Sequence, residues 1–378
     1  MKNIKTLISL VFTGMLMTAC TPVNKQEKIK EKNPYIKYAT GFSIHKKENY
    51  TTIEIAAPFQ GATETISFYV YKEGALLAEN HKKTDYIQLP LQRFIPTSTT
   101  HIPMIELLNS EHKIVGFPDT KYVSSLKTRA LIDRGDILDI GGEQQINTEI
   151  LLDLNPQLMI AFSVKGNHRN FDIIQKMGVP IIYNGDWLEG TPLGKAEWIK
   201  FFGVLLDQEE RADSIFKHIE QNYLAAKKLV KNTKHQKRVL SGGPFKDIWN
   251  NPKGESYEAQ FLKDAQLDYV FKDTKGNGSL SYNVEQIFVQ AKDIDIWLTP
   301  SFYNSMETLG NGNSIFKEFD AYKKDQVYSF VNTKGATGGL IYYELAAIRP
   351  DYVLKDLIKI GYPELLPDYE MQFYKKLN

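Results

Sequence analysis

Few side chains in this sequence have the types and spacing that catalysis requires. Ser98, Thr99 and Thr100 directly precede His101, which brings hydroxyl nucleophiles and an imidazole base together in the sequence. Such close neighbours rarely reach the geometry of a nucleophile and its base. No G-x-S-x-G, G-x-x-x-x-G-K-[ST], H-E-x-x-H or G-x-G-x-x-G motif occurs. We therefore expect a binding protein without a cofactor, and a hydrolase using residues 98–101 is one alternative.

A directly bound metal is a second alternative. His101 and His168 fall in loops that we expect at one cleft, where a carboxylate such as Glu307 could join them. The seven histidines are scattered, however, and solvated or hydrogen-bonded imidazoles are the commoner explanation. We expect no metal site, with His101 and His168 as its only candidate ligands.

Aromatic and hydroxyl side chains make a richer set. They lie in segments that follow short apolar runs, at Ser98, Thr99, Thr100, Lys165, Tyr183, Trp187, Trp249, Tyr282 and Phe302. Aromatic faces bury apolar area, and a few hydroxyl or ammonium groups orient a ligand's polar edge. These residues predict a site for a large planar or apolar ligand with polar edges. Packing in a core is the alternative for each aromatic.

The elements that must position these residues alternate between strand and helix. After a β pattern over 41–94, short apolar runs predict strands at 113–117, 137–140, 158–162, 180–184, 239–241, 268–271, 294–298 and 327–331. Helical patterns lie between them at 102–109, 147–154, 170–177 and 192–203, and again at 342–348 and 350–360. This alternation favours parallel sheets, whose ligands bind at the carboxyl ends of the strands.

The longest helical pattern covers 207–231, near the middle of the chain. Its apolar stripe consists of Ala212, Ile215, Phe216, Ile219, Tyr223, Ala226, Leu229 and Val230. On either side, Asn147-Thr-Glu149 and Asn283-Val-Glu285 begin similar helix–strand–loop units. We predict an α/β fold of two Rossmann-like lobes, 95–206 and 232–378, joined by this helix. An N-terminal β-strand extension would occupy 35–94.

The N-terminus has the pattern of an exported and anchored protein. Lys2 and Lys5 precede an apolar run that ends before Cys20, the only cysteine. The segment resembles a bacterial lipobox, which implies a signal peptide at 1–20 and a diacylated Cys20. Residues 21–34 are polar and predict a flexible tether. We expect a monomer in the cell envelope, held on a membrane facing the periplasm or exterior by its lipid.

Charge and composition exclude one class of partner. The chain has 46 basic and 45 acidic residues, a net charge of +1, and 42% hydrophobic residues. There is no basic field for nucleic acid. The sequence is that of an ordinary globular protein with room for two cores.

Several segments together resemble a known family. They are residues 98–101 before a helix, IVGF at 114–117, NTEILLDLNPQLMIAF at 147–162, MGVPIIYNGDWLE at 177–189 and PLGKAEWIKFFG at 192–203. Their order and spacing are similar to the class III substrate-binding proteins of bacterial ABC importers, from residue 94 to the C-terminus. That resemblance implies a cleft that binds cobalamin, haem or a ferric siderophore and delivers it to an ABC permease.

The resemblance also implies roles for particular residues. Family ligand contacts transfer best to Tyr183 and Trp187, and then to Trp249 and Phe302. Permease docking by an acid on each lobe implies Glu307 in the second lobe. In the first lobe His168 stands where an acid is expected, and Glu189 is the substitute. A bare divalent-metal-binding protein and a lipoprotein hydrolase remain the alternatives.

Overall fold

The computed structural model describes residues 35–378 except 57, 76–84, 143–144, 165–168 and 247. The expected signal peptide, tether and lipidated Cys20, and also Lys165 and His168, lie outside the described residues. Residues 33–378 cluster as one compact unit. Within the described ranges, no helix has both the length and the apolar character that a membrane span requires.

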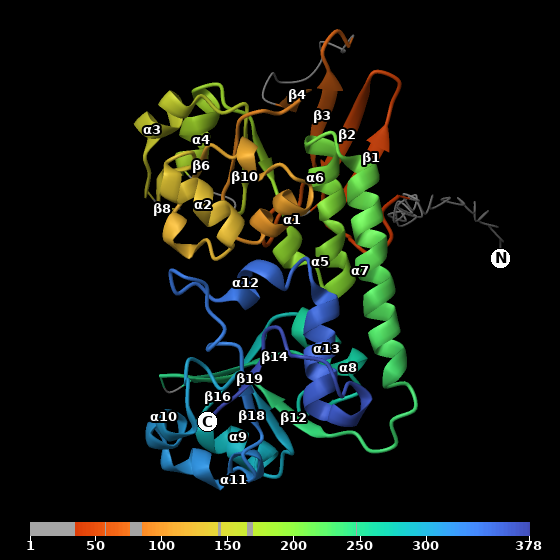
Figure 1. Cartoon of the computed structure of the whole chain (residues 1–378), viewed down its shortest axis with the longest axis vertical. Helices are drawn as coiled ribbons and strands as arrows, with labels where there is room; N and C mark the ends of the chain where they lie inside the picture. Colours follow the sequence, from red (N-terminus) through yellow and green to blue (C-terminus); the bar gives the residue numbers. More distant parts are fainter. Residues whose placement is uncertain (1–34, 57, 76–84, 143–144, 165–168, 247) are drawn as a thin grey trace, which may run out of the picture. The chain divides into compact units, whose positions relative to one another are not determined.

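A four-stranded sheet begins the described chain (Figure 1). Its order is β1 (Phe42–Lys46), β2 (Tyr50–Ile55), β3 (Ile66–Lys72) and β4 (Tyr86–Leu89). The first two pairs are antiparallel, and β4 runs parallel to β3. Alternate residues such as Ile53, Ile55 and Phe68 are buried, as the period-two pattern predicted. This inner face packs on α6 (Ile199–Leu205), where the Phe42 ring lies 6.3 Å from that of Phe201.

The N-terminal lobe has a parallel sheet. It contains β5 (Phe94–Pro96), β10 (Leu158–Ala161) and β11 (Ile181–Tyr183) in the order β11-β10-β5. A parallel bridge from Phe94 to Ile114 continues it toward β6 (Gly116–Phe117) and β7 (Leu138–Asp139). The helices are α1 (His101–Leu107), α2 (Leu126–Arg134), α3 (Thr148–Leu154) and α4 (Arg169–Lys176), and β8 (Gly141–Gly142) and β9 (Gln145–Ile146) form a small hairpin.

The C-terminal lobe has a five-stranded sheet of order β15-β12-β17-β18-β19. The strands are β12 (Arg238–Ser241), β15 (Asp268–Tyr269), β17 (Ile296–Leu298), β18 (Val327–Ser329) and β19 (Lys375–Lys376), and only β19 runs antiparallel. The helices are α8 (Tyr257–Asp264), α9 (Val284–Ala291), α10 (Met306–Gly312), α11 (Asp320–Lys323), α12 (Ile341–Leu345) and α13 (Pro350–Gly361). Single 3-10 turns lie at Glu111–Lys113, Thr120–Tyr122, Asp186–Leu188, Ser314–Glu318 and Pro363–Leu365.

A second sheet in this lobe does not follow the α/β alternation. It is antiparallel and consists of β13 (Gly243–Phe245), β14 (Ile248–Pro252) and β16 (Ser279–Tyr282), with β14 in the centre. The sequence patterns predicted no strand at 243–252. Asn and Pro are poor strand formers, so neighbouring strands and the core of the lobe must hold this segment extended.

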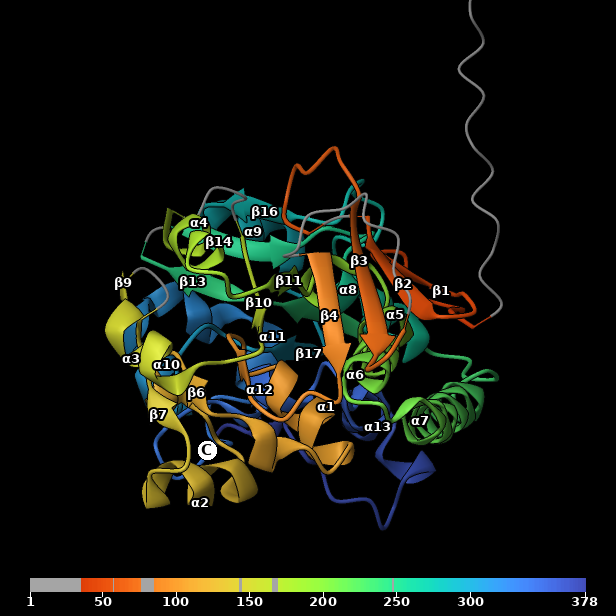
Figure 2. The ribbon, with the colours of Figure 1, turned by 90° about the horizontal axis from the view of Figure 1, so that it is seen from above.

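The long helix α7 (Glu209–Leu229) contributes to two apolar cores. Near its beginning, Ala212, Phe216 and Ile219 belong to a core shared with the N-terminal sheet and α6. Near its end, Tyr223 and Ala226 belong to the core of the C-terminal lobe. The helix packs on α6 and α13, and Figure 1 shows it running alongside both lobes. The view from above in Figure 2 places α7 at one side, next to α6 and α13. One amphipathic face therefore joins the lobes, as the apolar stripe predicted.

The helix starts predicted for the two similar units are confirmed. The Asn147 side chain accepts hydrogen bonds from the N–H groups of Glu149 and Ile150 at the start of α3. Asn283 and Gln286 form a capping box at the start of α9. Each helix leads to a strand of its lobe, β10 or β17. The short polar side chain satisfies N–H groups that a helix leaves free at its first turn.

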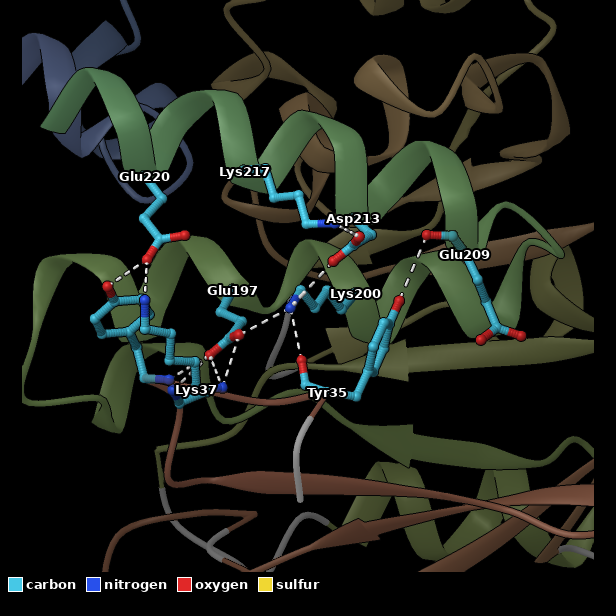
Figure 3. Close-up of polar contacts among 10 residues, drawn as sticks. Tyr35, Lys37, Glu197, Lys200, Glu209, Asp213, Lys217 and Glu220 are labelled. Carbon is cyan, nitrogen blue, oxygen red and sulfur yellow. Dashed lines mark hydrogen bonds and ion pairs between the residues drawn. The ribbon is translucent and has the colours of Figure 1, made fainter. Parts of the chain in front are cut away.

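Residues 35–41, which we call the N-terminal strap, lie across α5 (Pro192–Glu197), α6 and α7 (Figure 3). The buried Glu197 carboxylate accepts the N–H groups of residues 37–39, at 2.6–3.0 Å. The buried Lys200 ammonium donates to Glu197 and to the carbonyl of Tyr35, at 3.0 and 2.6 Å. On α7, Glu220 accepts from the Lys37 and Tyr38 side chains. The strap is thus held by charged groups inside the fold.

Candidate ligand-binding site

A cavity of about 270 Å³ lies at the carboxyl ends of β12, β17 and β18. This is the edge of a parallel sheet at which α/β proteins bind ligands. Its polar lining includes Ser241, Asn250, Asn251, Glu258, Ser279, Thr299 and Ser301, and its aromatic lining includes Phe261, Phe302, Phe330, Tyr342, Tyr343 and Tyr374. The composition matches the aromatic and hydroxyl-rich site expected from the sequence.

Aromatic rings make one wall of the cavity. Phe330 and Tyr342 stack with ring centroids 4.1 Å apart and planes 4° from parallel, and Tyr374 meets Phe330 edge-on at 5.6 Å. Burial raises the pKa values of Tyr342 and Tyr374, so their hydroxyls stay neutral. Tyr343 and Phe302 are 56% and 69% exposed, so their faces are available to a ligand. The wall offers flat apolar surface with hydroxyl edges.

Asn251 supplies an unpartnered polar group in the same cavity. It is 1% exposed, and neither its amide oxygen nor its nitrogen has a hydrogen-bond partner among the described residues. Its neighbour Asn250 accepts a bond from Ser281, at 3.0 Å. A buried amide without a partner costs about 1–3 kcal/mol, which a ligand's polar edge would recover. Asn251 is therefore a strong candidate for ligand recognition.

The N-terminal lobe has a matching group of polar atoms after β11. The side-chain nitrogen of Asn184 and the indole nitrogen of Trp187 are buried without hydrogen-bond partners in the described structure, and the Asp186 carboxylate between them in the sequence is also buried. Burial raises the pKa of Asp186, although Lys195 and Thr100 act to lower it. The loop thus presents donors and an acceptor from adjacent residues, and such groups are normally paired in a folded protein.

Charged side chains meet where the lobes approach one another. The Lys195 ammonium of α5 lies 3.9 Å from the ring centroid of Tyr257 in α8. Burial lowers the pKa of Lys195, while Asp186 and Glu258 act to raise it. Glu258 lines the cavity, where desolvation raises its pKa and the charge of Lys195 acts to lower it. Charges from both lobes therefore act on one another where α5 approaches α8.

The hydroxyl residues predicted for the first lobe lie before α1, and the predicted aromatic residues lie in β11 and in the loop that follows it. Ser98, Thr99 and Thr100 are half-buried before α1, and the Ser98 and Thr100 hydroxyl oxygens are 3.0 Å apart. Trp187 is half-buried against Phe162, at 5.9 Å between ring centroids. Tyr183 packs on Phe171 and on Phe59 of the N-terminal extension, so part of its ring serves packing. Their roles in ligand binding stay predictions.

Two aromatics predicted for the second lobe lie elsewhere. Trp249 is fully buried and stacks on Trp297 at 5.2 Å, so its assignment as a ligand contact is wrong. Tyr282 stacks on Phe271 at 5.4 Å and is absent from the cavity lining. The third, Phe302, does line the cavity. Core packing, the alternative for every aromatic, applies to Trp249.

The assignment of Glu189 to permease docking is also wrong. Its carboxylate is 3% exposed and accepts bonds from the N–H groups of Thr40 and Gly41 and from the indole of Trp198, at 2.8–3.0 Å. This carboxylate therefore holds the strap in place and is not available on the surface. Glu307 is exposed in the first turn of α10, so its docking role stays a prediction.

His101 does not face the cleft. It is fully buried against Phe202, with neither ring nitrogen hydrogen-bonded in the described structure, and burial lowers its pKa to about 3. Its use as a metal ligand or as a catalytic base is therefore wrong. Among the described residues, no three His, Cys, Asp or Glu side chains are grouped to hold a metal ion.

Sequence reasoning missed several of the site's residues. Asn251 and Glu258 follow segments without a clear periodic pattern, and Tyr342, Tyr343 and Tyr374 come from the last part of the chain. The pair Tyr342-Tyr343 was visible only as the beginning of a helix. An unusual density of tyrosine near the C-terminus was the available signal.

Comparisons with known proteins agree with this architecture. A periplasmic binding protein family model matches residues 96–332, more than half of the chain. A lipoprotein of Methanocaldococcus jannaschii, itself uncharacterized, is 27% identical over 312 residues, covering 80% of this chain and 72% of its own. A second uncharacterized lipoprotein of that organism is 25% identical over 358 residues, covering 91% and 87%.

Solved structures share the fold at low sequence identity. A periplasmic binding protein from Veillonella parvula has a TM-score of 0.60 at 14% identity, covering 87% of this chain and 98% of its own. A possible iron-binding, periplasmic solute-binding protein from Staphylococcus epidermidis has a TM-score of 0.56 at 18% identity, covering 72% and 99%. The periplasmic haem-binding protein HutB of Vibrio cholerae has a TM-score of 0.54 at 14% identity, covering 70% and 99%.

The fold and its cavity are those of a two-lobed solute-binding protein, a binding protein rather than an enzyme. The chain belongs to the periplasmic binding protein family, whose model matches residues 96–332.

Proposed function

We propose that this protein is a lipid-anchored receptor that captures a bulky metal chelate and delivers it to an ABC permease. The chelate would be cobalamin, haem or a ferric siderophore. The observation that best supports this proposal is the cavity at the strand ends, with its aromatic wall and the unpartnered amide of Asn251. The unpartnered group after β11 offers matching contacts from the other lobe.

The size of the cavity supports a ligand shared between the lobes. Its volume of about 270 Å³ lies below the roughly 300–1,000 Å³ of pockets that enclose a whole drug-sized ligand. A chelate would place one edge in this cavity and extend toward Trp187 in the other lobe. Burying its apolar faces contributes about 25 cal/mol per Å².

Anchoring by lipid at Cys20 is part of the proposal. Two relatives are lipoproteins, and the Cys20 segment resembles a lipobox. Metabolic labelling with palmitate should mark the protein, and Cys20→Ser should abolish both the label and the recovery of the protein with membranes. Labelling that persists in the variant would contradict this attachment site.

Two other functions were open from the sequence. A hydrolase is excluded by the family and by the His101 imidazole, which is buried with neither ring nitrogen bonded to the Ser98 hydroxyl. A receptor for a bare divalent metal would need ligands that the described residues do not group together. A chelate, which brings its own metal ligands, suits the aromatic wall better.

Calorimetric titration of the purified protein tests the choice. We would titrate cyanocobalamin, haemin and a panel of ferric siderophores, with zinc and manganese salts as the competing hypothesis. Stoichiometric binding of one chelate class is the expected result. Tight binding of a bare metal, with no response to any chelate, would replace the proposal.

A further inference from the structure

The chain connects the lobes a second time, through residues 333–348. After β18 the segment leaves the C-terminal sheet and contacts the N-terminal lobe, and α13 then begins at Pro350. Ala347 and Ile348 are buried in the core that contains Phe94 and Trp198 of the N-terminal lobe. Figure 1 shows α12 between the two lobes, near α1. We call residues 333–348 the crossing segment.

Glu344 makes the polar contact of this segment. Its carboxylate is 4% exposed and accepts the N–H groups of Ser124 and Ser125, at 2.6 and 2.8 Å. Each oxygen takes one of the two donors, so the pair of bonds also fixes the orientation of α12. Hydrogen bonds to a charged acceptor are the stronger ones in proteins.

Tight backbone contacts surround this carboxylate. A Cβ atom on Gly339 would lie 2.6 Å from the Ser124 hydroxyl oxygen and 2.9 Å from the Tyr122 carbonyl oxygen. A Cβ on Gly335 would lie 2.6 Å from that of Ser124. The Thr337 hydroxyl donates to the Val123 carbonyl at 3.4 Å. Only glycine permits the segment to approach the N-terminal lobe this closely.

The same short helix carries the cavity wall. Tyr342 and Tyr343 line the cavity, and Glu344 follows them directly in α12. Anything that fixes Glu344 against Ser124 and Ser125 therefore also fixes the two rings between the lobes. The crossing segment begins just after the 96–332 region of the family match.

We propose that Glu344 is a positioning residue for the ligand site: it locks α12 to the N-terminal lobe and so holds the Tyr342–Tyr343 wall in place. Loss of the lock should let the wall move and the ligand leave faster. The ligand part of this inference rests on the function proposed above. The lock itself is tested without any ligand.

The pKa of Glu344 shows that burial disfavours its charged form, while its hydrogen bonds favour it. Burial raises its pKa to about 7, the Ser124 and Ser125 N–H groups act to lower it, and the charge of Glu106 on α1 raises it further. Because burial removes water from the carboxylate, its charged form is stabilised by these hydrogen bonds rather than by solvation.

Hydrogen–deuterium exchange of the ligand-free full chain measures the lock. Glu344→Ala removes the acceptor, and Gly339→Ala wedges a methyl group between the segment and Ser124. We expect the amides of Ser124 and Ser125, and those of α12, to exchange at least about tenfold faster in both variants, equivalent to losing about 1.4 kcal/mol. The matched controls are Glu318→Ala, on the surface, and Gly278→Ala, whose Cβ would meet nothing within 4 Å.

A conservative variant distinguishes the loss of this contact from a general loss of folding. Glu344→Gln keeps the shape and one acceptor, so exchange at Ser124 and Ser125 should fall between that of the wild type and Glu344→Ala. Exchange indistinguishable from the controls in all three variants would overturn the lock. Faster exchange at Ser124 and Ser125 with α12 unchanged would overturn the positioning role.

Ligand release gives the second readout. With whichever of cyanocobalamin, haemin or a ferric siderophore binds the wild type, we expect release about tenfold faster in Glu344→Ala and Gly339→Ala, and unchanged release in both controls. Release unchanged in every variant would refute the link between lock and site. If no chelate binds the wild type, the proposed function fails, and the ligand-free exchange still decides the lock.

Discussion

Two tryptophans of similar appearance in the sequence have different surroundings in the structure. Both indole nitrogens lack a hydrogen-bond partner in the described structure, but Trp187 is half-buried, whereas Trp249 is fully buried between Trp297, Phe316 and Phe319. Trp187→Ala should weaken chelate binding and leave the melting temperature nearly unchanged. Trp249→Ala should lower the free energy of unfolding by about 3–5 kcal/mol. Calorimetry and thermal melts of both variants check this contrast, and a collapsed melting temperature for Trp187→Ala would assign it to the core.

His101 predicts a dependence of stability on pH. Burial lowers its folded-state pKa to about 3, whereas the unfolded chain has the ordinary value of about 6.5. The unfolded state therefore binds a proton first as the pH falls. The stability that His101 contributes is complete above about pH 6.5 and is lost as the pH falls toward 3, by about 1.4 kcal/mol per unit.

The variant His101→Leu should remove this dependence. It also replaces two unpartnered nitrogens by an apolar side chain, so it should be at least as stable as the wild type at neutral pH. Urea unfolding between pH 4 and pH 7.5 is the measurement, with the exposed His235→Leu as the control. Parallel pH profiles for wild type and His101→Leu would contradict the argument.

At this scale the sequence could predict the types of residue in the site better than their identities. The rule that ligands meet loops at strand ends found Phe302 and the Trp187 loop. It could not separate Trp249 from Asn251, which lie on the same face of one short strand that no pattern predicted. Aromatic character is the same in a core and in a binding wall, so only packing distinguishes them.

At the scale of elements, the strongest predictions came from long periodic segments. The helix expected at 207–231 is α7, Glu209–Leu229, and the strands expected at 158–162 and 180–184 are β10 and β11. The helix expected at 192–203 divides at Trp198 into α5 and α6. The sheet of β13, β14 and β16 was missed because its stability comes from pairing rather than from local pattern.

Glu197 and Lys200, which hold the N-terminal strap and which we call the clamp, predict a large loss of stability when Glu197 is replaced. Glu197→Ala would remove the acceptor of three N–H groups and leave the Lys200 ammonium in the interior without its closest carboxylate. Removing one partner of a buried ion pair costs about 3–5 kcal/mol. Chemical denaturation should show this loss, and the amides of residues 37–39 should exchange faster.

Glu210→Ala is the matched control for the clamp. Glu210 is exposed in the first turn of α7, where its substitution should change stability by less than about 1 kcal/mol. Equal stability of the Glu197 and Glu210 variants would show that the buried network contributes little.

At the scale of the whole molecule, the predicted pair of lobes and the connecting helix are present. The apolar stripe of α7 could be read locally, and its division between two cores follows from its length. The crossing segment could not be foreseen, because its glycines gave no periodicity. Its partners, Ser124 and Ser125, lie more than two hundred positions away, and only the folded chain brings them to Glu344.

Docking to the permease is the prediction that belongs to this scale. Reversing charge with Glu307→Lys should leave chelate affinity unchanged and slow uptake by cells, because a steered charge contact mainly changes the rate of association. The control is Glu285→Lys, also exposed in the first turn of a capped helix, so that both reversals perturb a helix N-terminus alike. Identical uptake by the Glu307 and Glu285 variants would remove the docking role.

The strap also determines how the protein carries mechanical force. Its amides end on two carboxylates, Glu197 and Glu189, set in and just before α5. The side chains that hold the strap lie in or beside α5, α6 and α7, and none of them lines the cavity. A force applied at Tyr35 would therefore reach these helices before it reached the strands around the cavity.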